Sequence, residues 1–197
     1  MNNSGMVLRT GYKPVAIAFG VFVLSYLFDF DTLSFLGFIG VLFFLYYFRN
    51  ENVYTPNELY CVTSPIDGKV VAIDKTDNQV KIYLQTSLLG IKKIVSPIGG
   101  DLKIKYFQNG ANLSSFEYKS KYLNQQAELC IGNLTMKIIV GKWNTSFEIN
   151  KEIKNVRSAD TLMLANDVMV VLQFDKGDIL VDIGENVTLC KQIAVIN

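Results

Sequence analysis

The chain has 197 residues, enough for one domain of ordinary size with an appendage and too few for two full-sized catalytic domains. Its 19 Lys and Arg residues nearly balance its 18 Asp and Glu residues, so it lacks the basic field that nucleic-acid binding requires. The sequence contains no histidine, which excludes Ser-His-Asp, Cys-His and His-metal mechanisms.

Two uncharged apolar runs, residues 15–28 and 32–48, stand near the N-terminus with an acidic turn between them. They predict a helical hairpin within residues 1–52. A membrane-spanning helix needs about 20 residues, so both runs are short. We nevertheless expect a transmembrane hairpin, and the positive charges outside the two runs place both of its ends in the cytoplasm. A re-entrant or interfacial hairpin and a cleaved signal sequence stay open as alternatives.

From residue 53 onward, short runs rich in Val, Ile and Tyr alternate with turn residues. These runs are residues 69–73, 79–85, 102–107, 134–140, 168–174 and 179–183. They predict that residues 53–197 form a mainly β, compact antiparallel domain. Only residues 115–129 have the length and composition of a soluble helix, and we expect a helix there.

One short motif occurs twice in this region, as SPIDGKV at residues 64–70 and as SPIGGDL at residues 96–102. A turn followed by a strand, used twice, predicts two related, barrel-sandwich-like halves. Near the C-terminus, residues 183–187 and 193–195 look like the turn and strand of lipoyl carriers. The sequence therefore also allows a lipoyl-like interaction module that docks an envelope complex.

Several segments, in order along the chain, carry a family resemblance. They are YFRN at residues 47–50, SPIDGKV at residues 64–70, residues 112–126 and residues 181–196. Together they resemble the bacterial phosphatidylserine decarboxylase family in its short form. Members of that family cut themselves at a Gly-Ser bond near the C-terminus. The new N-terminus becomes a pyruvoyl group, which serves as the electron sink for loss of CO₂.

The resemblance assigns three site positions. Asp67 lies at the family's acid/base Asp, Lys92 lies at its His, and Asn166 lies at its cleavage Ser. A carboxamide cannot be eliminated as a serine oxygen can, so the resemblance implies a degenerate site that forms no pyruvoyl group, and we expect no cofactor. Ser158 and Thr161 are alternative hydroxyls for a shifted cleavage site. Neither follows a Gly, the residue that gives the backbone the freedom an acyl shift needs.

Asp67 and Lys92 also have simpler interpretations. An Asp before Gly68 is what a tight turn requires, whether or not chemistry occurs there. Lys92 stands next to Lys93, and we expect the two to be a solvated pair or to contact lipid phosphate near a membrane surface.

These observations lead to an expected function. We expect a membrane-anchored, phosphatidylserine decarboxylase-related protein of phospholipid metabolism that does not process itself. It would bind an aminophospholipid such as phosphatidylserine, or partner an active paralogue or a second copy of itself. Its expected location is the bacterial inner membrane, with the β domain on the cytoplasmic side. The alternatives are an active decarboxylase with a shifted nucleophile, which would make phosphatidylethanolamine, and the interaction module.

Overall fold

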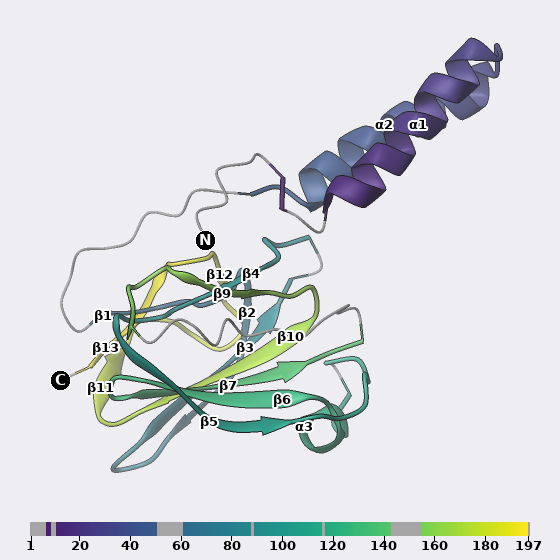
Figure 1. The fold of residues 1–197 in the computed structure, drawn as a ribbon. Coiled ribbons are helices and arrows are strands. Elements are labelled where there is room, and N and C mark those ends of the chain that lie inside the picture. The colour runs from purple at the N-terminus through teal and green to yellow at the C-terminus, as the bar shows by residue number, and fades with distance from the viewer. Residues whose placement is uncertain are drawn as a thin grey trace. The chain divides into compact units, whose positions relative to one another are not determined.

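The computed structural model describes residues 7–8, 11–50, 61–87, 89–115, 117–142 and 155–196. The chain divides into two compact units, Met1–Asn52 and Val53–Asn197. Figure 1 shows both, with a pair of helices in the first unit and β-structure in the second.

The first unit is an antiparallel pair of helices, α1 (Tyr12–Leu27) and α2 (Asp31–Tyr47). The helices approach closely at Gly37, where an added Cβ would lie 2.8 Å from the Phe22 Cα. Large apolar side chains remain exposed on both helices. The predicted helical hairpin is therefore confirmed.

The two helices have 16 and 17 residues. At a rise of about 1.5 Å per residue, each falls short of a hydrocarbon core of about 30 Å. Within the part of the chain that the structure describes, no helix combines the length and the apolar character needed to cross a membrane. The prediction of a transmembrane hairpin is therefore not supported.

The second unit is mainly β, as predicted, and its strands pair antiparallel. Its strands are β1 (Cys61–Thr63), β2 (Gly68–Lys75), β3 (Val80–Thr86), β4 (Lys93–Val95), β5 (Gly100–Gln108), β6 (Gln126–Ile131), β7 (Leu134–Val140), β8 (Asn155–Val156), β9 (Thr161–Leu164), β10 (Val168–Phe174), β11 (Gly177–Ile179), β12 (Asn186–Val187) and β13 (Gln192–Ile196). The short helix α3 (Ser120–Leu123) stands between β5 and β6.

The strand order shows that the domain is built from two related halves. The largest sheet has the order β12-β2-β3-β10-β7-β6-β5-β8, flanked by β1-β13-β11 and by β4-β9. The centre of this order lies between β10 and β7. Strands at equal distances from the centre correspond in the two halves: β10 to β7, β3 to β6, β2 to β5 and β12 to β8. One half, β4 to β9, is continuous in sequence and is inserted between β3 and β10 of the other half.

The repeated sequence motif lies at equivalent places in the two halves. The Ser64 hydroxyl donates to the Ile66 carbonyl at 2.7 Å, and the Ser96 hydroxyl donates to the Ile98 carbonyl at 2.6 Å. The two turns also bond each other reciprocally. The Thr63 amide donates to the Pro97 carbonyl at 3.0 Å, and the Val95 amide donates to the Pro65 carbonyl at 2.9 Å. The prediction that the motif marks related halves is confirmed.

Each motif is closed by a second turn with the same geometry. The Cys190 amide donates to the Ser64 carbonyl and the Ala159 amide donates to the Ser96 carbonyl, both at 2.9 Å. Cys190 and Ala159 have positive φ angles of 61° and 67°. The equivalence therefore extends from the first strands of the two halves to their last strands.

The predicted helix over residues 115–129 is wrong for most of its length. Only α3 (Ser120–Leu123) is helical, and β6 follows at Gln126. Asn124 ends the helix because its buried side chain donates to the Leu113 and Val140 carbonyls, at 2.6 and 2.7 Å. Beyond it, pairing of β6 with both β5 and β7 overrides the local preference.

Gly68 and Gly99 lie in corresponding turns, one motif position apart, and provide a test of the packing. A Cβ at Gly68 would overlap the Gln85 carbonyl oxygen, whereas the nearest atom to a Cβ at Gly99 is 3.6 Å away. We expect Gly68→Ala to lower the free energy of unfolding by about 1–3 kcal/mol, because the β2–β3 pairing must shift. Gly99→Ala should change it little in the same urea titration, and equal losses in both variants would contradict this packing.

Cys190 provides a pH-dependent test of the buried turn. Burial raises the pKa of the Cys190 thiol to about 11. The folded chain therefore favours the protonated thiol, and this stabilisation is complete below the pKa of an unfolded cysteine, about 8.5. We expect wild-type stability to fall between about pH 8.5 and 11 more steeply than that of Cys190→Ala, measured by denaturant unfolding across this range. Parallel pH profiles would contradict the assignment.

Candidate functional site

The three positions that the sequence singled out lie together at the end of β3. The Asp67 carbonyl accepts a hydrogen bond from the Ser87 amide at 3.1 Å. The Lys92 ammonium donates to the Ser87 carbonyl at 3.2 Å. The main-chain carbonyl oxygen of Asn166 lies 3.4 Å from the Thr86 hydroxyl. Residues 86 and 87 therefore connect all three positions, although Asp67 and Asn166 are 99 positions apart in the chain.

The site is the place where the chain crosses between the two halves. Residues 87–92 lead from β3 into β4, and residues 165–167 lead from β9 back into β10. The two crossings bond each other directly, since the Ala165 amide donates to the Lys92 carbonyl at 3.2 Å. We call this region the junction.

Lys92 lies inside the junction, with 2% of its surface exposed, while Lys93 is half-buried. The expectation of a solvated lysine pair is therefore wrong for Lys92. Successive residues of an extended chain point to opposite faces, so adjacent lysines do not share an environment. A buried ammonium needs polar partners, and the Ser87 carbonyl is one of them.

Asp67 holds the first crossing in place. Its carboxylate accepts a hydrogen bond from the Ile91 amide at 3.1 Å. Gly90 packs against it so closely that an added Cβ would lie 3.2 Å from a carboxylate oxygen. These contacts are the ones expected of a structural turn residue.

Asp167, which sequence reasoning did not single out, organises the second crossing. Its buried carboxylate accepts hydrogen bonds from the Ser115 hydroxyl, from the Ser115 amide at 3.3 Å and from the Lys142 amide at 3.1 Å. Gln85 donates to the same hydroxyl at 2.9 Å. Removing this carboxylate would leave several buried donors unsatisfied, at about 1–3 kcal/mol for each group.

No sequence signal marked Asp167, because an Asp just before a strand looks like an ordinary turn residue. Its hydrogen-bond partners come from the segment before α3 and from the residues that follow β7, and Gln85 of β3 is joined to them through the Ser115 hydroxyl. Gly141 belongs to the same arrangement, since a Cβ there would overlap the Asp167 carboxylate.

Ser158 and Thr161 lie away from the junction. Ser158 is in a turn in which the Asp160 amide donates to the Arg157 carbonyl at 3.1 Å. Thr161 pairs with Val95, at the opposite end of the β4–β9 ladder from Leu164. Three residues of strand, about 10 Å, thus separate Thr161 from the end that leads to Asn166.

The chemistry available at the junction is limited by its side chains. Asn166 carries a carboxamide, which cannot be eliminated as a serine oxygen can. The hydroxyl of Thr86 accepts from the Val168 amide at 3.0 Å and contributes to the β3–β10 pairing. Among the described residues, no group of three His, Cys, Asp or Glu side chains is placed to hold a metal ion.

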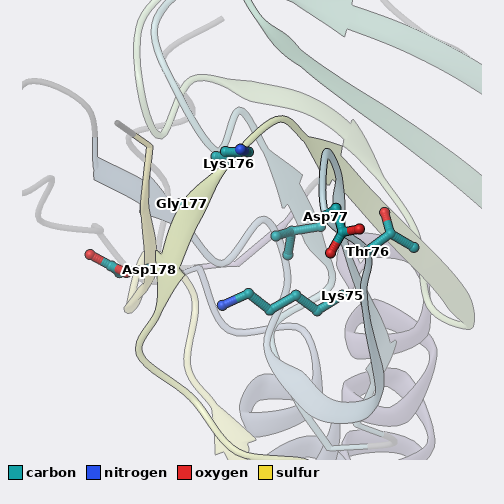
Figure 2. A pocket seen from close by; sticks show the side chains of 7 residues that line it. Lys75, Thr76, Asp77, Lys176, Gly177 and Asp178 are labelled. Carbon is teal, nitrogen blue, oxygen red and sulfur yellow. The ribbon is translucent and has the colours of Figure 1, made fainter.

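A surface depression of about 470 Å³ lies elsewhere on the β domain. Figure 2 shows its lining, which comes from two turns, residues 75–80 and residues 176–178. The first of these turns joins β2 to β3 at the end opposite Gly68 and Thr86. Seven residues of strand, about 23 Å, therefore separate the depression from the junction.

Among the comparisons with known proteins, only the comparison with curated proteins finds relatives, and the three given below carry one name. No protein-family model matches the chain, and no solved structure matches it significantly. A phosphatidylserine decarboxylase proenzyme from Carboxydothermus hydrogenoformans is 26% identical over 154 residues, which cover 74% of this chain and 71% of that protein.

Two further relatives carry the same name. The proteins from Desulfotalea psychrophila and Chlorobium chlorochromatii are each 29% identical, over 108 and 103 residues. The matches cover 51% and 48% of this chain, and the chain spans about half the length of each of these two proteins. The resemblance that the sequence motifs indicated is confirmed: all three relatives carry the name phosphatidylserine decarboxylase proenzyme, and their similarity supports a divergent relationship of this chain to that family.

Proposed function

We propose that this protein acts in phospholipid metabolism as a non-processing relative of phosphatidylserine decarboxylase. In this proposal it binds an aminophospholipid head group, alone or beside an active relative. One observation carries the proposal: Asn166, which the resemblance assigns to the family's cleavage position, lies in a crossing whose neighbours are tied into structural hydrogen bonds.

Loss of self-processing follows from elementary chemistry. A serine ester can be eliminated because its β-carbon carries an oxygen leaving group, and elimination creates the ketone. The β-carbon of Asn166 carries a carboxamide carbon instead, so no ketone forms there. Lys92, at the position of the family's His, is buried and donates to a backbone carbonyl.

The kind of ligand is suggested by the names of the relatives, which act on phosphatidylserine. Of the two lysines expected to contact lipid, Lys92 is buried, so we assign this role to the half-buried Lys93. The exposed apolar side chains of α1 and α2 support association with a bilayer. We place the protein at the bacterial inner membrane, with the β domain on the cytoplasmic side.

An active decarboxylase with a shifted nucleophile is less consistent with the geometry. Ser158 and Thr161 stand at the far end of the β4–β9 ladder from Lys93 and Leu164. A nucleophile there would cut the chain outside the crossing that joins β9 to β10.

The first test is the covalent state of the purified full-length chain. We expect one species with the mass of all 197 residues, unreactive towards hydroxylamine and borohydride, because no ketone is formed. Intact mass spectrometry before and after treatment measures this. Two fragments, the downstream one carrying a carbonyl in place of its amino terminus, would contradict the proposal and restore the active decarboxylase.

The second test is head-group preference, measured on monomeric lipid so that bilayer attachment does not contribute. We expect dihexanoyl phosphatidylserine or phosphatidylethanolamine to bind the full chain more tightly than dihexanoyl phosphatidylglycerol in calorimetric titrations. Lys93→Gln should weaken binding about fivefold, since one lysine near lipid phosphate contributes about 1 kcal/mol. Lys176→Gln, at the distant depression, serves as the control. Equal affinities for all three lipids would rule out aminophospholipid recognition, and an interaction module would then remain.

A further inference from the structure

The segment around α3 presents aromatic, basic and aliphatic side chains at the surface. Tyr118, Lys119, Tyr122 and Leu123 are exposed and Lys121 is half-buried, and we call these five residues the α3 surface. Tyr118 is 73% exposed, Tyr122 is 62% exposed and Leu123 is 51% exposed. Three large, mostly exposed apolar side chains within six residues form a cluster, which distinguishes them from singly scattered surface apolar residues.

The α3 surface is held in a defined arrangement. The Tyr118 and Tyr122 rings meet edge to face with centroids 5.7 Å apart, and their hydroxyls are 3.3 Å apart. The Lys121 ammonium lies 5.7 Å from the centre of the Tyr83 ring on β3. Asn124, fully buried just after α3, fastens the segment to the end of β7.

The same segment is joined to the junction. Ser115, five residues before α3, donates to the Asp167 carboxylate, and Asp167 follows Asn166. Val140, which accepts the Asn124 bond, pairs with Val168 at the start of β10. The α3 surface therefore lies at the junction end of the sheet, away from the depression at residues 75–80.

The composition of the surface matches the boundary of an anionic bilayer. Tyrosine rings favour the head-group region, where the ring is apolar and the hydroxyl is wet. Leucine favours the acyl boundary, and lysines are attracted by anionic lipid. Glu117 is the one acidic side chain among the described residues from 117 to 123, against Lys119 and Lys121.

We propose that the α3 surface seats the β domain on an anionic phospholipid bilayer, with the junction turned towards the head groups. This inference rests on the proposed function, because it supplies the orientation in which a membrane lipid would reach the junction.

The test places a fluorescent probe at each end of the sheet in the full chain. Trp143, the single tryptophan, is first replaced by Phe. Tyr122→Trp then reports on the α3 surface, and Asp77→Trp reports on the β2–β3 turn at the opposite end. The vesicles contain phosphatidylserine and phosphatidylcholine, and the acyl chains either carry bromine atoms near the head-group end or carry none.

We expect bromine to reduce emission about twofold at position 122 and to leave position 77 unchanged, since interfacial residues reach about 5–10 Å into the boundary. Equal quenching at both positions, or none at position 122 in vesicle-bound protein, would overturn the proposed orientation. A concentration-dependent blue shift of the position 122 emission without vesicles would assign the surface to a second copy of the chain instead, and would also overturn it.

Paired substitutions separate this inference from the proposed function. A Trp probe at position 123, introduced as Leu123→Trp in the Trp143→Phe background, should be quenched by brominated lipid. Tyr118→Ser with Tyr122→Ser should abolish this quenching. Leu180→Ser with Ile183→Ser, another pair of exposed apolar side chains outside the α3 surface, should leave that quenching intact. Binding of monomeric dihexanoyl phosphatidylserine should persist in both variants. Loss of the quenching at position 123 in both paired variants would overturn the bilayer assignment. Failure of the unsubstituted chain to bind monomeric dihexanoyl phosphatidylserine would refute the proposed function alone.

Discussion

The pairing of β7 with β10 is the interaction on which the domain depends. Six residue pairs join these strands at the centre of the eight-stranded sheet, and each strand belongs to a different half. Because one half is inserted into the other, the chain must cross between them twice, beside this central pair. The junction is therefore a product of topology, and its two crossings are held together by backbone bonds such as that from Ala165 to Lys92.

Backbone bonding holds the junction together independently of most side chains at its positions. The bonds from Ser87 to Asp67 and from Ala165 to Lys92 involve main-chain atoms, which every residue but proline supplies in full. Changing the side chain at position 92 or 166 alters the chemistry without removing these bonds. Here Lys92 is buried and Asn166 stands in the second crossing, and the same main-chain bonds can form with other side chains at both positions.

Short, local patterns predicted the β domain well. Alternating runs marked most long strands, and the repeated SPI motif marked the two related turns. The helix predicted over residues 115–129 was wrong because Asn124 and the neighbours of β6 lie far away in the chain. The burial of Lys92 and Asp167 could not be predicted for the same reason. Burial depends on which residues pack against a side chain, and these neighbours are distant in the sequence.

The amino-acid sequence by itself determined the class of fold, the hairpin of helices, the duplicated turn and the family resemblance, because each depends on residues close together or on motifs in order. It also determined that the chain contains no histidine and that positions 92 and 166 carry a lysine and an asparagine, since side-chain identity is a covalent property. Only the tertiary structure decided that Asp67, Lys92 and Asn166 meet, and that Asp167 organises their surroundings. Those facts arise from insertion of one half into the other, which brings together segments that are distant along the chain.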